Sequence, residues 1–237
     1  MERNMAEDVI VTEGIAKTYD DSGVPVHAVR GIDYTLSRGE FTAIIGPSGS
    51  GKTTFLNLIA GLDTPTEGKV WLSGTLISDM SGRELSDFRR DNIGFIFQAF
   101  NLFPVLSVEE NIEYIMLLQG VPKKERHRRV MDILEKVGLS DYADRRPMKL
   151  SGGQQQRVAV ARAMVSEPSL VIADEPTANL DSETSGELLD MMRRLNRETG
   201  MTFLFSTHDE VVMRRADRIV VLRDGRIDGR ADPEDFK

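Results

Sequence analysis

Cysteine is absent from this sequence of 237 residues, and histidine occurs only three times. Without cysteine the chain has no disulfide framework, no cysteine-ligated zinc and no thiol nucleophile. His27, His127 and His208 are the only imidazole groups that remain as metal ligands. We therefore do not expect a structural metal centre.

Long apolar runs are also lacking. No stretch reaches the ~18 consecutive apolar residues of a membrane-spanning helix, and the N-terminal residues contain no apolar segment typical of a signal peptide. The net charge of −8 provides no broad basic surface for nucleic acid, and the basic run at residues 123–129 is typical of a solvated helix face. The sequence thus predicts a cytoplasmic chain that neither spans a membrane nor binds nucleic acid.

The apolar runs that do occur are short and predict an α/β fold. Phe41–Ile45, Leu170–Ala173 and Thr202–Phe205 are continuous apolar stretches, as in strands that helices cover on both faces. Val9–Thr12 and Val26–Leu36 alternate instead, which predicts antiparallel strands with one solvated face. We expect a parallel core next to an N-terminal antiparallel β-subdomain.

Helical periodicity replaces the strand pattern between about residues 84 and 166, and Asp224-Gly225 predicts a type I′ hairpin near the C-terminus. At roughly 150 residues per domain, the length corresponds to one large domain. We predict a single domain over residues 1–237. Within it, residues 1–92 and 167–237 form the α/β core, and residues 93–166 form an inserted helical subdomain.

A phosphate-binding loop follows the first apolar strand. Residues 46–53 read GPSGSGKT and fit the pattern G-x4-G-K-[ST] between a buried strand and an apolar helix. The glycines let backbone N–H groups turn toward phosphates, and the helix N-terminus adds a favourable dipole. Lys52 is expected to neutralise phosphate oxygens and Thr53 to hold Mg²⁺. The core is therefore predicted to be a P-loop NTPase (RecA-like) fold that binds ATP.

An acid pair follows the apolar run LVIA, at the strand end where open α/β sheets place their ligands. Asp174 is expected to contact Mg²⁺, directly or through water, and Glu175 to polarise the attacking water as general base. The alternative is an ordinary strand-end turn formed by Glu175 and Pro176.

Two further segments carry weaker signals. Ser151 and Gln154 have the spacing of a helix capping box, but capping does not explain the two glycines between them, which let an anion approach bare N–H groups. A second phosphate-contacting helix N-terminus follows as a possibility. His208, after the run TFLF, is expected on the phosphate side, where it would bond the γ-phosphate or the attacking water. Gln98 alone is equally compatible with a buried amide.

Together these motifs resemble the nucleotide-binding subunits of ABC transporters over about residues 8 to 230. The resemblance identifies Gln98 as the Q-loop glutamine, which joins Thr53 and Asp174 at the metal, and His208 as the switch histidine. It identifies Tyr19 as the aromatic that stacks on adenine and Asp181 as part of the D-loop. The nucleotide-binding residues that it implies are Tyr19, Gly46, Pro47, Ser48, Gly49, Ser50, Gly51, Lys52, Thr53, Thr54, Ser151, Gly152, Gly153, Gln154 and Asp181.

The resemblance further implies a homodimer that holds two ATP molecules head to tail. Glu175, His208, Lys52 and Gln98 of one chain would act in catalysis opposite Ser151, Gly152 and Gly153 of the other. Within the family the sequence is most similar to the lipoprotein-releasing and macrolide-exporting ATPases (LolD and MacB type) and to FtsE. Transport, regulation of a membrane partner and, less favoured, a soluble non-transport ATPase remain open, as does the substrate.

A transporter ATPase needs a membrane partner, and residues 100–106, FNLFPVL, form a candidate docking segment. The resemblance implies that an integral-membrane permease of the MacB or FtsX type docks there and holds the chain on the inner face of the membrane. Phe100, Leu102 and Phe103 would form part of the groove. The alternative is that these side chains pack the core of the helical subdomain itself.

Overall fold

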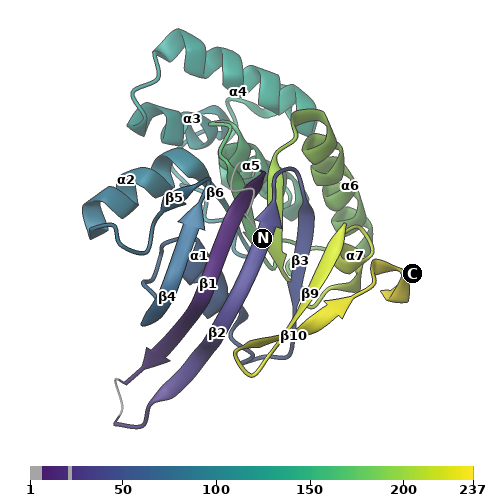
Figure 1. Cartoon of the computed structure of the whole chain (residues 1–237). Coiled ribbons are helices and arrows are strands. Elements are labelled where there is room, and N and C mark those ends of the chain that lie inside the picture. The colour runs from purple at the N-terminus through teal and green to yellow at the C-terminus, as the bar shows by residue number, and fades with distance from the viewer. Residues whose placement is uncertain (1–6, 21–22, 237) are drawn as a thin grey trace.

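The computed structural model describes residues 7–20 and 23–236, which form two sheets with helices between and around them (Figure 1). Much of the N-terminal segment in which no signal peptide is expected lies outside the described residues. The larger sheet has six strands in the order β10-β9-β3-β8-β7-β6, parallel except for the β9–β10 hairpin. This confirms the predicted α/β core. Its strands are β3 Phe41–Ile45, β6 Ile93–Phe97, β7 Leu170–Asp174, β8 Thr202–Ser206, β9 Arg218–Arg223 and β10 Arg226–Ala231.

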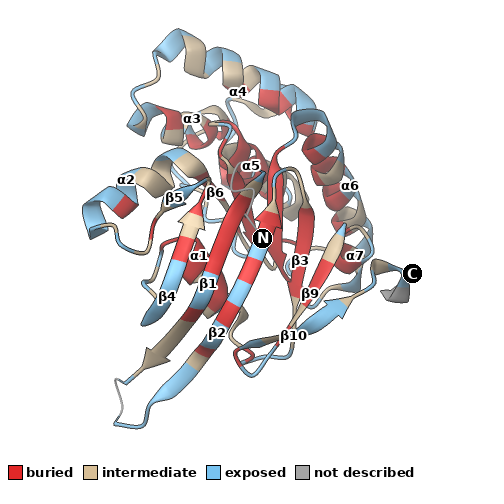
Figure 2. Cartoon of the chain, viewed as in Figure 1, coloured by how far each residue is buried: buried red, intermediate tan, exposed pale blue. Residues whose placement is uncertain are grey.

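The three continuous apolar runs lie side by side as β3, β8 and β7 at the centre of this sheet. Successive side chains of a strand point to opposite faces. On β7, Leu170 and Ile172 join one hydrophobic cluster, whereas Val171 and Ala173 join the other. Both faces of the strand are therefore covered, and Figure 2 shows the neighbouring strand β3 red over most of its length.

The second sheet has four strands in the order β2-β1-β4-β5 and is antiparallel, as predicted for the N-terminal strands. On β2, Ile32, Tyr34 and Leu36 are buried, while the residues between them are exposed. These side chains share a hydrophobic cluster with Phe55 of α1, so α1 packs between the two sheets. The bounds are β1 Asp8–Tyr19, β2 Val26–Ser37, α1 Lys52–Ile59, β4 Glu67–Leu72 and β5 Thr75–Leu76.

Helices α3 to α6 cover the other face of the six-stranded sheet and share a second hydrophobic cluster with it. No helix among the described residues is long and apolar enough to cross a membrane. The helices are α2 Gly82–Asn92, α3 Val108–Leu118, α4 Lys123–Val137, α5 Gly152–Met164, α6 Ser182–Thr199 and α7 Glu210–Met213, with short 3₁₀ turns at Ser140–Tyr142, Pro147–Lys149 and Pro233–Phe236.

One predicted boundary needs correction. The sequence places residues 93–97 in the helical segment, but they form β6, which pairs in parallel with β7 at the edge of the six-stranded sheet. Gly94 permits this arrangement because a Cβ there would lie 2.1 Å from the carbonyl oxygen of Ala163 in α5. The α/β core thus includes β6, and the helical segment begins after Phe97.

Replacing Gly94 with alanine is expected to destabilise the fold by about 1–3 kcal/mol, because the added methyl group meets backbone rather than a side chain that can move. Urea denaturation followed by circular dichroism measures the change. Gly82→Ala is the matched control, because an added Cβ at this helical glycine would meet no described atom within 4 Å, and it should stabilise the protein slightly. Equal stability of the two variants would contradict the close packing of β6 on α5.

Candidate active site

A large pocket opens at the carboxyl ends of the parallel strands β3, β7 and β8. Its volume is about 1060 Å³, and it is lined by the phosphate loop, the start of α1, the residues that follow β7 and β8, and part of β2. Open α/β sheets bind their ligands at this edge. The pocket brings together most of the residues predicted from the motifs, namely Gly46, Pro47, Ser48, Gly49, Gly51, Lys52, Thr53, Thr54, Gln98, Asp174, Glu175 and His208.

Two glycines of the phosphate loop have no room for a side chain. A Cβ on Gly46 would lie 2.0 Å from the carbonyl oxygen of Leu222, and one on Gly51 would lie 2.4 Å from that of Ala28. Gly51 also has a φ of 99°, which side chains disfavour. Helix α1 then begins at Lys52 with no side-chain cap and no acid in its first turn. Its first backbone N–H groups are therefore available to an anion.

Lys52 contributes a positive charge to this loop. Its Nζ donates hydrogen bonds to the carbonyl oxygens of Gly46 at 2.7 Å and Pro47 at 3.1 Å, and it forms no ion pair with a described residue. Neutral carbonyls leave the ammonium charge uncompensated, so a phosphate would bind it strongly. Ser50 is absent from the pocket lining: its hydroxyl is buried without a hydrogen bond in the described structure, and its carbonyl oxygen accepts from the N–H of Gly225.

The carboxylates at the end of β7 occupy different environments. Burial raises the pKa of Asp174, and the nearby Glu175 charge raises it further, while the Ser206 hydroxyl and Lys52 lower it. Glu175 has a φ of 47° and is fixed by its N–H bond to the Ser206 carbonyl oxygen. A non-glycine residue in this region is strained, and such strain clusters at functional sites.

Glu175 and His208 lie in contact although 33 positions separate them in the chain. Oε1 of Glu175 lies 2.7 Å from Nδ1 of His208, and Oε2 accepts a hydrogen bond from the Thr207 hydroxyl at 3.2 Å. Both partners follow β8, which pairs directly with β7. Sequence reasoning missed Thr207, although the rule that singled out Asp174, a polar side chain after a buried strand, applies to it as well.

Comparison with known proteins decides the family. The family model described as "ABC transporter" matches residues 29–178. An uncharacterized ABC transporter ATP-binding protein of Thermotoga maritima is 48% identical over 213 residues, which cover 90% of this chain and 91% of the relative. The chain belongs to the ABC transporter ATP-binding family.

Other relatives include a lipoprotein-releasing system ATP-binding protein, LolD 1 of Rhodopseudomonas palustris. It is 44% identical over 225 residues, covering 94% of this chain and 99% of the relative. Among solved structures, the cassette MJ0796 of Methanocaldococcus jannaschii is similar. Its structure is described as a dimeric post-hydrolysis state bound to ADP and Pi. It matches this chain with a TM-score of 0.85 and 39% identity, covering 94% of this chain and 98% of that chain. These matches confirm the resemblance, the fold class and the assignment as an ATPase domain.

Residues 150–154, LSGGQ, which the family resemblance identifies as the ABC signature, lie outside this pocket. Ser151 caps α5, accepting from the Gln154 N–H while the Gln154 side chain accepts from the Ser151 N–H, which confirms the capping box. Gly153 packs closely on α6, since a Cβ there would lie 2.5 Å from a methyl carbon of Thr184. Close helix packing is thus one reason for that glycine, in addition to the predicted approach of an anion. Gly152 has more room, since a Cβ there would lie 3.7 Å from its nearest neighbour, a methyl carbon of Leu180.

Two other predicted residues also have structural partners. The Tyr19 hydroxyl donates to Asp63 at 2.8 Å, and the Lys17 ammonium lies 5.0 Å from the centre of the Tyr19 ring. Tyr19 is not part of the pocket lining, which instead includes Pro25 and the first residues of the neighbouring strand β2, Val26 to Ala28. Asp181 caps α6, accepting hydrogen bonds from the N–H and hydroxyl of Thr184.

The residues present are compatible with Mg²⁺. Among the described residues no cluster of three or more His, Cys, Asp or Glu side chains could hold a metal by itself. The pocket instead offers the half-buried carboxylate of Asp174, together with Thr53 and Gln98. Magnesium is typically held by one or two protein oxygens, water and substrate phosphates rather than by an all-protein cage, so this sparse donor set suits it.

Proposed function

We propose that the chain binds ATP with Mg²⁺ in this pocket and hydrolyses it as one half of a homodimer that drives a membrane permease. The observation that carries the proposal is the placement of the Glu175–His208 pair in the same pocket as the open N-terminus of α1 and the cation of Lys52. The dimeric, ADP- and Pi-bound state of the similar cassette MJ0796 supports it.

Each residue of the pocket has a distinct role in this proposal. The α1 N–H groups and Lys52 bind the phosphates, and Thr53, Asp174 and Gln98 would hold the magnesium, which supplies charge neutralisation at the β- and γ-phosphates. Glu175 accepts a proton from the attacking water as general base. His208 and the hydroxyl of Thr207 fix the carboxylate of Glu175 in position.

The second chain would complete the site. Ser151 to Gln154 lie at the start of α5, outside the pocket of their own chain. The capping box uses the N–H groups of Ser151 and Gln154, so those of Gly152 and Gly153 are the ones available to a nucleotide held by another copy. Asp181 begins α6 beside them, since Gly153 of the signature packs on Thr184 of α6. Tyr19 would stack on adenine after its side chain leaves Asp63. ATP would then join the two chains, and hydrolysis would release them.

Part of the segment at residues 100–106 is suited to docking a permease. Leu102 packs against the chain's own core, as in the alternative interpretation, and Phe100 is half-buried. Phe103 is 44% exposed and Val105 72%. Buried Asn111 holds this loop, accepting from the Phe103 N–H and donating to the carbonyl oxygens of Phe103 and Leu106. The proposed docking surface is therefore Phe103 and Val105, with Tyr114 5.1 Å from the Phe103 ring.

Replacing Phe103 with serine is expected to lower recovery of the chain with its permease while ATP hydrolysis by the isolated chain continues, because an exposed aromatic anchor is lost. Pull-down from membranes and a thermal melt measure both effects. Met148→Ser, at a residue that is 85% exposed, is the matched control and should leave recovery unchanged. A marked fall in melting temperature with unchanged partner binding would reject the docking role of Phe103.

Within the family we propose a LolD/MacB-type transporter subunit held on the inner face of the membrane by its permease. The similarity to LolD 1 over 99% of that relative supports this assignment. An FtsE-like role, in which the ATPase cycle acts on a membrane partner without transport, predicts the same pocket. Purification of the chain with its membrane partner tests the assignment: an integral-membrane protein that copurifies and stimulates ATP hydrolysis supports it, and a fully active chain with no such partner contradicts it.

A further inference from the structure

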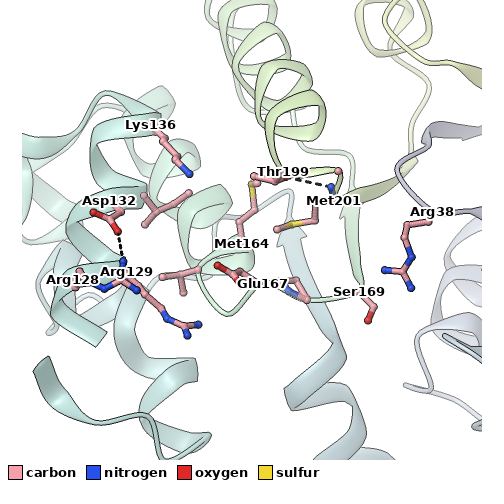
Figure 3. A pocket seen from close by; sticks show the side chains of 14 residues that line it. Arg38, Arg128, Arg129, Asp132, Lys136, Met164, Glu167, Ser169, Thr199 and Met201 are labelled. Carbon is pink, nitrogen blue, oxygen red and sulfur yellow. Dashed lines mark hydrogen bonds and ion pairs between the residues drawn. The ribbon is translucent and has the colours of Figure 1, made fainter. Parts of the chain in front are cut away.

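A second cleft lies at the amino ends of the core strands, the opposite edge of the sheet from the proposed ATP pocket. Its volume is about 490 Å³. One wall is α4 of the helical segment, and the other comprises residue 38 before β3, the turn 164–169 between α5 and β7, and residues 199–201 before β8 (Figure 3). A ligand in this cleft would contact the helical segment and the α/β core at the same time.

The charge of this cleft is opposite to that of the whole chain. The chain carries a net charge of −8, but the lining contains four cationic and two acidic side chains. A cleft that concentrates one sign of charge raises the local concentration of ions of the other sign. The cations are Arg38, Arg128, Arg129 and Lys136, and the acids are Asp132 and Glu167.

Two of the four cations are already paired. Arg128 forms ion pairs with Glu125 and Asp132, and Arg129 pairs with Glu125. The side chains of Arg38 and Lys136 form no ion pair or hydrogen bond with any described residue. Figure 3 shows Lys136 extending from α4 and Arg38 from the other side of the cleft. No described acidic side chain pairs with these two positive charges, so both are available to an anion.

The floor of the cleft is apolar. Ile133, Met164 and Met201 line it and are each at most 8% exposed. Figure 3 places the two methionine side chains between α4 and Arg38. Methionine is flexible and polarisable, so it adapts to apolar groups of varied shape. An apolar floor below a few charged groups is the usual composition of a small-molecule site, and the volume lies in the common range of roughly 300–1,000 Å³.

We propose that this cleft binds a small amphipathic anion, with its apolar body on Ile133, Met164 and Met201 and its acidic group attracted by Lys136 and Arg38. Glu167 lies between these cations in Figure 3 and opposes the anion. The backbone of Glu167 has a φ of 54°, and its N–H donates to the carbonyl oxygen of Met164, which fixes the backbone of this residue at the cleft. The inference is independent of the proposed ATPase role.

The experiment uses 1-anilinonaphthalene-8-sulfonate, a fluorescent aromatic sulfonate, as the probe on the full chain without nucleotide. Methyl-¹³C methionine labelling locates the binding, because Met164 and Met201 line this cleft and can be assigned by Met→Leu variants. We expect saturable binding that shifts the methyl signals of these two methionines. The uncharged analogue N-phenyl-1-naphthylamine and inorganic phosphate should each bind more weakly, since each lacks one of the two recognised features.

Charge variants give effects of opposite sign. Lys136→Gln and Arg38→Gln should each weaken binding of the sulfonate by about two- to fivefold, and Glu167→Gln should tighten it by a similar factor. Lys124→Gln and Glu135→Gln, exposed positions of α4 outside the cleft lining, are the matched controls and should change nothing. A loss of folding would only weaken binding of the sulfonate. It therefore cannot explain weaker binding by two variants together with tighter binding by the third.

Three results would overturn the proposal. The first is an absence of shifts at Met164 and Met201 when the sulfonate binds. The second is equal affinity of the five variants and the parent chain for the sulfonate. The sulfonate would then bind as an adventitious additive only. The third is equal affinity for the uncharged analogue, which would leave no role for the cations.

Discussion

Glu175→Gln is expected to slow ATP hydrolysis by about 10²- to 10⁴-fold while ATP binding persists, because the amide keeps the shape of the carboxylate but loses its basicity. The structure also indicates that the glutamine side chain can keep the position of the carboxylate. The carboxylate contacts both His208 and Thr207, and an amide oxygen still accepts from the Thr207 hydroxyl. Single-turnover hydrolysis and fluorescent-nucleotide binding, measured on the same preparation, separate the two effects.

Thr207→Val is the graded control for Glu175→Gln. It removes one hydrogen bond to the carboxylate but keeps the general base, so hydrolysis should fall far less than in Glu175→Gln. If the glutamine variant turned over ATP within a few-fold of the parent chain, the assignment of Glu175 as general base would be wrong.

Lys52→Ala and Ser151→Arg are expected to abolish activity by different routes. Loss of Lys52 removes a cation that contacts phosphates in both the ground and transition states, so ATP affinity and hydrolysis fall together. Ser151 lies outside the pocket of its own chain, so the arginine variant should bind ATP normally as a monomer and fail to dimerise. Equilibrium binding of ATP and sedimentation with ATP distinguish the variants. Equal loss of monomer affinity in both would contradict a site shared between chains.

The parts of the structure that the sequence predicted are those set by local pattern. The phosphate loop, the capping box at Ser151 and the Asp224-Gly225 hairpin each depend on residues within a few positions of one another. The hairpin is confirmed: Asp224 and Gly225 have φ values of 49° and 76°, as a type I′ turn requires. The central strands were predicted because both faces of a buried strand are apolar.

The errors and omissions concern contacts between distant segments. β6 was assigned to the helical segment because it lies between helices in the sequence, and the need for Gly94 becomes visible only when α5 packs against it. Thr207 was missed because the sequences of the two strands do not show that β8 lies beside β7 in the sheet. The partial burial of Leu102 and the exposure of Phe103 likewise depend on how α3 and its loop pack.

Mixing the Lys52→Ala and Ser151→Arg chains tests the shared site most directly. A mixed dimer contains one site with both defects and one site with neither, since the intact phosphate loop of the Ser151→Arg chain faces the intact signature of the Lys52→Ala chain. We expect ATP hydrolysis to appear on mixing two chains that are each inactive alone. A mixture that hydrolyses no more ATP than the two separate chains would contradict the proposal that each site is built from two chains.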